Sequence, residues 1–212
     1  MTARAHLATG DVANAVWPSG NEWGVPTLDL ALQADVVDAP FARWGRERRK
    51  SRMRGTWHFY TDDYRFERLW LRPQDLVNSA CVATVEPNFS VSAATPPARA
   101  LWQVFRKRTL ARIWQHHGVR VIVDLAVDAT HAELNLLGVP RGWASWATRG
   151  SGITPDDLTR ELDRAAEHAG AQPKLFAVYG GSRRVRALCE RNGWLWRPEE
   201  ADVVRGRAAP HE

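Results

Sequence analysis

Acidic side chains follow a strand-like segment early in this chain, at residues 56–70 (TWHFYTDDYRFERLW). The segment begins with β-branched and aromatic residues, which favour a half-buried strand, and then reaches Asp62 and Asp63. Phe66, Leu69 and Trp70 have the spacing of an apolar helix stripe. Carboxylates between a strand and a helix lie where α/β proteins place active sites.

Further polar groups follow the other strand-like segments, and parallel strands would bring their carboxyl ends to one face. The residues expected there are Asp62, Asp63, Glu86, Asn88, Ser90, Asp124, Thr148, Arg149 and Tyr179. Carboxylates from different strands can hold a divalent cation or act as a general acid and base. A structural role is the alternative, with Asp63 capping its helix and Asp124 paired with an arginine inside its strand.

The longest helix signal, residues 97–118, carries arginines among its apolar residues. At about 100° per residue, Arg106, Arg108 and Arg112 project onto or beside the apolar face. Because an unpaired buried charge is costly, these arginines need carboxylates or a bound anion. Glu67, Asp63 and Glu86 are candidate partners, and a phosphate is the functional alternative.

Two other segments could contact phosphate. Gly180 and Gly181 precede a helix start with Ser182, Arg183 and Arg184, and a glycine turn before a helix suits an anion. Residues 45–54 (GRERRKSRMR) contain six Lys or Arg against one Glu. We expect this run to be a loop, either solvated or in contact with phosphates.

Strands and helices that could position these groups alternate along the chain. We expect strands within residues 36–44, 56–60, 80–85, 119–127, 142–148 and 174–179. Helices are expected after Asp63, over residues 97–118, and after the caps Thr154 and Ser182, the last two ending at Gly170 and Gly193. Five or six strands alternating with helices predict a mainly parallel α/β sheet, a partial or degenerate (β/α) barrel, with an open α/β sheet as the alternative.

The chain is expected to form one α/β domain over residues 46–197. An irregular N-terminal wrap at residues 1–45 and a loose polar tail at residues 198–212 flank it.

The net charge of +5 favours polyanionic partners, although solubility alone also explains it. Most of the 11 tryptophans should fill the core, with Trp146 and Trp196 the best candidates for exposure.

Several function classes are disfavoured. Cys81 and Cys189 lie in apolar patterns and predict core thiols in a reducing compartment. No apolar run reaches the ~18 residues of a membrane span and no secretory signal is evident, so a cytoplasmic protein is expected. No zinc-ligand spacing, phosphate-binding P-loop or GxSxG motif is present.

Five segments resemble, in order, an uncharacterised family of bacteria, phages and mobile elements called domain of unknown function 4417. WHFYTDDYRFERLW is similar to its HFFxDDYRFERxW segment, and EPNFS to its TPDFS element. LWQVFRKRTLARIWQHHGVRVI, LGVP and VYG resemble its helix–strand, GIP and YG elements. The likeness spans roughly residues 36–184. Asn88 stands where the family has Asp, and Thr109 replaces a Trp.

The resemblance implies that functional positions include Asp62, Asp63, Tyr64, Arg65, Glu67, Pro87, Phe89, Ser90, Arg106, Arg108, Trp114, Tyr179 and Gly180. With the strand-end reasoning, the candidate catalytic residues are Asp62, Asp63, Glu67, Glu86 and Asp124. The remaining candidates for binding are Asn88, Arg112, Arg149, Gly181 and Arg183. The family brings no established activity.

Three functions are consistent with these features. The first is a phage- or plasmid-type accessory protein that binds or processes nucleic acid, with a divalent metal as a candidate cofactor. The second is a barrel-like enzyme that uses paired carboxylates on a small molecule or carbohydrate. The third is a non-catalytic module that binds a host protein.

Overall fold

The computed structural model describes residues 17–45 and 53–199, in which seven parallel strands lie side by side in chain order. The strands are β1 (Phe41–Arg43), β2 (Thr56–His58), β3 (Ala83–Val85), β4 (Arg120–Asp124), β5 (Ser145–Arg149), β6 (Leu175–Tyr179) and β7 (Leu195–Arg197). The sheet curls into a half-barrel with β1 and β7 at its edges. The predicted α/β, barrel-like fold is therefore confirmed.

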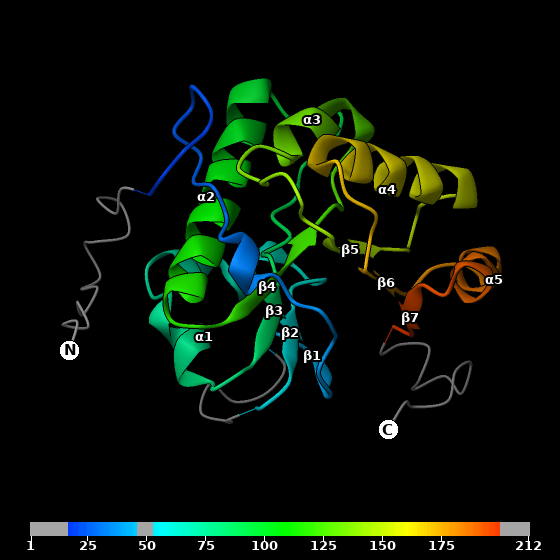
Figure 1. Cartoon of the computed structure of the whole chain (residues 1–212), viewed down its shortest axis with the longest axis horizontal. Coiled ribbons are helices and arrows are strands. Elements are labelled where there is room, and N and C mark those ends of the chain that lie inside the picture. Colours follow the sequence, from blue (N-terminus) through cyan, green and yellow to red (C-terminus); the bar gives the residue numbers. More distant parts are fainter. Residues whose placement is uncertain (1–16, 46–52, 200–212) are drawn as a thin grey trace.

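Helices connect the strands and surround the sheet. The helices within the described ranges are α1 (Gln74–Asn78), α2 (Pro97–His116), α3 (Ala132–Asn135), α4 (Pro155–Ala169) and α5 (Arg183–Asn192). The short 3₁₀ helices are η1 (Leu30–Leu32), η2 (Asp63–Arg65), η3 (Glu67–Trp70) and η4 (Ala129–His131). Figure 1 shows the α-helices in an arc around the strands, from α1 through α3 and α4 to α5.

Helix boundaries follow the predicted signals in most places. Pro97 begins α2, Thr154 caps α4 by accepting a hydrogen bond from the Asp157 amide, and Gly170 and Gly193 end α4 and α5 with positive φ. The single helix expected after Asp63 is wrong, because the chain forms η2 and η3 instead. Burial of Phe66 and Leu69 in the core fixes these short turns, so packing overrides the helical pattern. The strand β7 was not among those expected.

The two faces of the sheet have different environments. Val121, Val123, Trp146, Phe176 and Val178 pack against Leu158, Leu162 and Val185 of the outer helices. Alternate strand residues face the inside of the curl, where Ala83, Ile122, Ala147 and Ala177 form a second cluster with Tyr60 and Tyr179. Trp146 is fully buried, so its predicted exposure is wrong, because the pleat turns it toward the helices. Cys81 and Cys189 are buried as predicted.

The described part of the N-terminal segment packs against the amino ends of the strands. Ala34 donates its amide to the Val121 carbonyl, and the Gln33 side chain accepts a hydrogen bond from the Ala144 amide. Gln115 of α2 both donates to and accepts from the Asp29 backbone. Residues 1–16, most of the basic run at 46–52 and the tail at 200–212 lie outside the described residues, so the expected domain boundaries stay a prediction.

Candidate site at the carboxyl ends of the strands

A fully buried ion pair lies at the carboxyl end of β3. Glu86 pairs there with Arg108 of α2, and neither side chain is exposed to solvent. Arg108 Nε also donates to the Leu137 carbonyl at 2.8 Å, and Glu86 Oε2 accepts from the Asp124 amide at 3.2 Å. The structural alternative for this arginine, an ion pair with Glu86, is therefore what the structure contains. Each buried charge is therefore balanced by the opposite charge of its partner.

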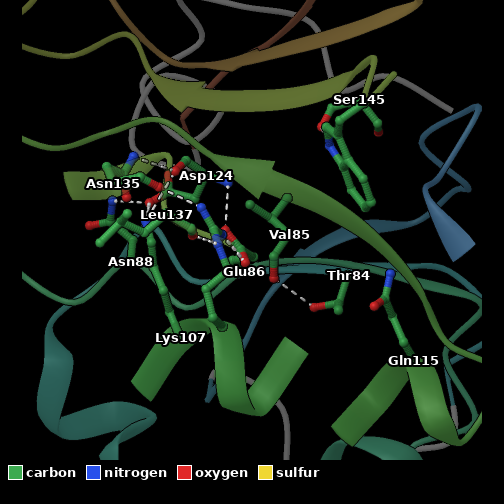
Figure 2. Close-up of polar contacts among 12 residues, drawn as sticks. Thr84, Val85, Glu86, Asn88, Lys107, Gln115, Asp124, Asn135, Leu137 and Ser145 are labelled. Carbon is green, nitrogen blue, oxygen red and sulfur yellow. Dashed lines mark hydrogen bonds and ion pairs between the residues drawn. The ribbon is translucent and has the colours of Figure 1, made fainter. Parts of the chain in front are cut away.

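A second buried charge pair lies at the end of β4. Lys107 Nζ is 3.3 Å from Asp124 Oδ2 and 3.1 Å from the Asp124 carbonyl oxygen, while Asn88 Nδ2 donates to Oδ2 at 3.1 Å. Figure 2 shows Lys107 reaching from α2 toward Asp124 and Asn88. Burial raises the pKa of Asp124 and lowers that of Lys107. Both shifts move the pKa of the group toward neutral pH, where a side chain can accept or donate a proton.

Aromatic residues extend this cluster inside the curl. The Tyr60 ring stacks on Tyr179 with centroids 5.6 Å apart. Burial, aided by the nearby Asp124 carboxylate, raises the pKa of Tyr60 well above its usual value. Burial and the charge of Arg43 lower the pKa of His58 to about 3, so this imidazole stays neutral at physiological pH. Tyr60, Asp124 and Lys107 thus have perturbed pKa values at the strand ends, as is common at functional sites.

A pocket of about 500 Å³ opens beside this cluster, at the carboxyl ends of β4 and β5. Its polar lining includes Asn88, Thr148 and Glu161 of α4, with Arg149 and Arg160 also lining it. Burial raises the pKa of Glu161 to about 8. A concave site whose lining combines apolar residues, many polar and charged side chains and a perturbed acid is the feature of the described residues that best fits ligand binding.

The carboxylates of the 56–70 segment lie elsewhere than expected. Asp62 is exposed and lies 3.6 Å from Arg65, and Glu67 is exposed and pairs with Arg106 at 3.2 Å. Asp63 accepts two hydrogen bonds from Ser90, from its amide at 3.0 Å and its hydroxyl at 2.9 Å. None of these contacts involves Glu86 or Asp124, and Asp63 connects η2 to the loop after β3 through its hydrogen bonds with Ser90.

Three other predicted binding residues lie away from the pocket. Arg112 is 3.8 Å from Asp29 and packs over the Trp17 ring. Trp114 is fully buried and donates to the Pro73 carbonyl, so it is a core residue and unavailable to a ligand. Tyr64 is exposed beside Arg65.

The side chain of Glu199 lies against the glycine turn before α5. Glu199 lies against Gly180, where its side chain contacts the Ser151 hydroxyl and is 3.6 Å from Arg149. Gly181 packs closely against Gly150. Arg183 begins α5 and is exposed. Trp196 is half-buried rather than exposed, because its indole donates to the Gly180 carbonyl.

A group of aromatic rings, of which Trp102 is the exposed member, lies at the surface where η3 meets α2. Trp102 is 47% exposed, its ring is stacked with Phe105 at 5.7 Å, and Trp70 meets it edge-on at 5.4 Å. Arg68 and Arg72 flank Trp70 in the sequence, and Arg99 lies one helical turn before Trp102. These three arginines are exposed and no described carboxylate pairs with them. We call these six residues the η3–α2 surface.

Sequence reasoning identified Glu86, Asn88 and Asp124 in the cluster but missed Tyr60, Lys107 and Glu161. For Lys107 and Glu161, the helical spacing contained a signal. Lys107 lies three residues after Val104 and four before Ala111 on α2, and Glu161 lies three residues after Leu158 on α4. Both charges therefore project onto buried stripes, which is unusual for Lys and Glu.

Within residues 17–45 and 53–199, no three His, Cys, Asp or Glu side chains gather as metal ligands would. Glu86 and Asp124 are instead paired with Arg108 and Lys107. In the same part of the chain, no helix combines the length and apolarity needed to cross a bilayer.

Comparison with known proteins places the chain in a family. The model of the domain of unknown function (DUF4417) matches residues 17–186. The chain belongs to this family. It is 32% identical over 185 residues to the Gene 1 protein of Mycobacterium phage D29, covering 82% of this chain and 67% of that protein. The Gene 1 protein of Mycobacterium phage L5 is 31% identical over 185 residues, covering 82% of this chain and 79% of that protein. No solved structure matches.

Family membership confirms the resemblance seen in the sequence and associates the chain with phages. The matched range includes both the strand-end cluster and the η3–α2 surface. The family brings no activity, so function rests on the geometry.

Proposed function

We propose that this DUF4417 protein binds nucleic acid, and that the η3–α2 surface is the contact. The observation that carries this proposal is the exposed Trp102 ring, which packs with half-buried Trp70 and Phe105 beside arginines that no described carboxylate pairs with. Bases of a single strand stack on exposed aromatic rings, and arginines bind the phosphates between them. The positive net charge of the chain favours the same partner.

The environment of Arg106 also supports this role. Its guanidinium lies over the Phe89 ring at 3.9 Å and 6.0 Å from the Trp102 ring. Gln103 and Glu67 hold it in place. A fixed cation beside the exposed Trp102 ring restrains that ring, which lowers the entropic cost of stacking a base on it.

The test is fluorescence anisotropy with labelled single-stranded and duplex oligonucleotides. Trp102→Ala should weaken single-strand binding by about 5- to 150-fold, since one base–aromatic stack contributes ~1–3 kcal/mol. Trp23→Ala is the matched control, because Trp23 is 54% exposed and does not belong to the η3–α2 surface. Equal binding by both variants would contradict the assignment of this surface.

A further inference from the structure

The pocket beside β4 and β5 contains polar atoms that the nucleic-acid surface does not use. Thr148 Oγ1 and Glu161 Oε2 are buried in the pocket wall, and the two side chains hydrogen-bond to each other. Thr148 as a whole is fully buried. Both side chains line the pocket, and a hydroxyl and a carboxyl group each keep hydrogen-bonding capacity beyond the bond between them, which a ligand with a donor and an acceptor can use.

We propose that this pocket binds a nucleotide, with the base against Thr148 and Glu161 and the phosphate at the arginines around it. Leu125, Val127 and Ile153 supply apolar lining for a flat ring. The volume of about 500 Å³ lies within the range of small-molecule sites.

A protonated Glu161 side chain can hydrogen-bond to the edge of a nucleobase. Burial raises its pKa to about 8, and the Asp124 carboxylate adds to this, while Thr148, Lys107 and Arg164 oppose it. A neutral carboxyl group both donates and accepts, which matches the adjacent donor and acceptor on a nucleobase edge. The charged or titratable groups around the pocket are Tyr60 after β2, Lys107 of α2, Asp124 of β4, Asp128 and His131 at η4, Arg149 of β5, and Asp157, Arg160 and Arg164 of α4.

The lining also offers phosphate ligands. Arg149, Arg160 and Arg164 all line the pocket. Arg149 is 3.6 Å from Glu199, and Arg164 is 3.4 Å from Glu133. Arg160 pairs with Asp157. These pairs are largely exposed and hence weak, so a phosphate with its greater charge can replace one of the carboxylates.

Isothermal titration with AMP, GMP, CMP and UMP tests the proposal. At least one should bind below pH 7, with affinity falling about tenfold by pH 9 as Glu161 loses its proton. Glu161→Gln keeps a donor and an acceptor and should bind without that loss. Glu167→Gln, an exposed change on the same helix, is the control and should behave like the wild type. An identical pH profile in Glu161→Gln and the wild type would overturn the proposal.

The nucleotide could be free or part of a bound strand, and a second arm separates these sources. If mononucleotides do not bind, Thr148→Val and Glu161→Ala should still weaken oligonucleotide binding, which indicates a nucleotide of the strand. If neither mononucleotides nor strands respond to these changes in variants with native melting curves, the proposal is wrong. The mononucleotide assay does not involve Trp102, so its outcome is independent of the η3–α2 surface.

Discussion

At the scale of single residues, the clearest consequence concerns the buried pair of Glu86 and Arg108. Glu86→Ala leaves Arg108 buried without its counter-charge, and we expect the free energy of unfolding to fall by about 3–5 kcal/mol. Glu67→Ala removes the carboxylate from a pair whose acid is 61% exposed, so its cost should be about 1 kcal/mol or less. Urea denaturation of both variants measures the difference. Similar losses would show that burial does not govern these pairs.

Glu161 predicts a pH dependence of stability. Its pKa of about 8 in the folded protein exceeds the ordinary value of 4.5. The folded state therefore keeps a proton that the unfolded chain releases as pH rises from 4.5 to 8, and stability falls over this window. Glu161→Gln removes the effect, so its advantage over the wild type should grow from pH 5 to pH 8, by at most about 1.4 kcal/mol per pH unit. Denaturation at both pH values checks this, and a constant difference would contradict it.

At the scale of elements, the turn between α1 and β3 holds an alanine in the left-handed region. Ala80 has φ 59, which costs a non-glycine residue roughly 1–2 kcal/mol. Ala80→Gly should therefore raise the free energy of unfolding by up to about 1 kcal/mol, after the greater chain entropy of glycine is subtracted. The same change at Ala98, which is exposed in α2, should lower it by about 1 kcal/mol. Thermal unfolding compares the two, and a loss of stability at both positions would contradict the account.

Elements also show what the sequence could predict. Local signals located α2, α4 and α5, since proline, cap residues and glycine act within one helical turn. The pattern after Asp63 predicted one helix, whereas the chain forms short 3₁₀ turns that bury Phe66 and Leu69 in the core. Core packing depends on distant parts of the chain, so the local pattern could not predict this. The residues 195–197 of β7 were too few to carry a strand pattern of their own.

At the scale of the molecule, the sequential order of parallel strands explains which of the predicted residues lie together and which do not. Parallel strands do bring Glu86, Asn88 and Asp124 together, as the strand ends predicted. The position of Asp62 and Asp63 depends on how the chain leaves β2, which strand order does not determine. Lys107 and Glu161 come from helices, and their inward direction depends on how α2 and α4 pack on the sheet.

The central claim is that the η3–α2 surface binds nucleic acid, and the dependence of affinity on salt tests it most directly. For a single strand, the logarithm of the binding constant should fall linearly with the logarithm of salt concentration, by about 0.7 per phosphate contact. Replacing Arg68, Arg72 and Arg99 with alanine should reduce that slope by about 2, whereas replacing Arg183, Arg184 and Arg191 of α5 should leave it unchanged. Binding that is absent, independent of salt, or equally affected by both triple variants would contradict the claim.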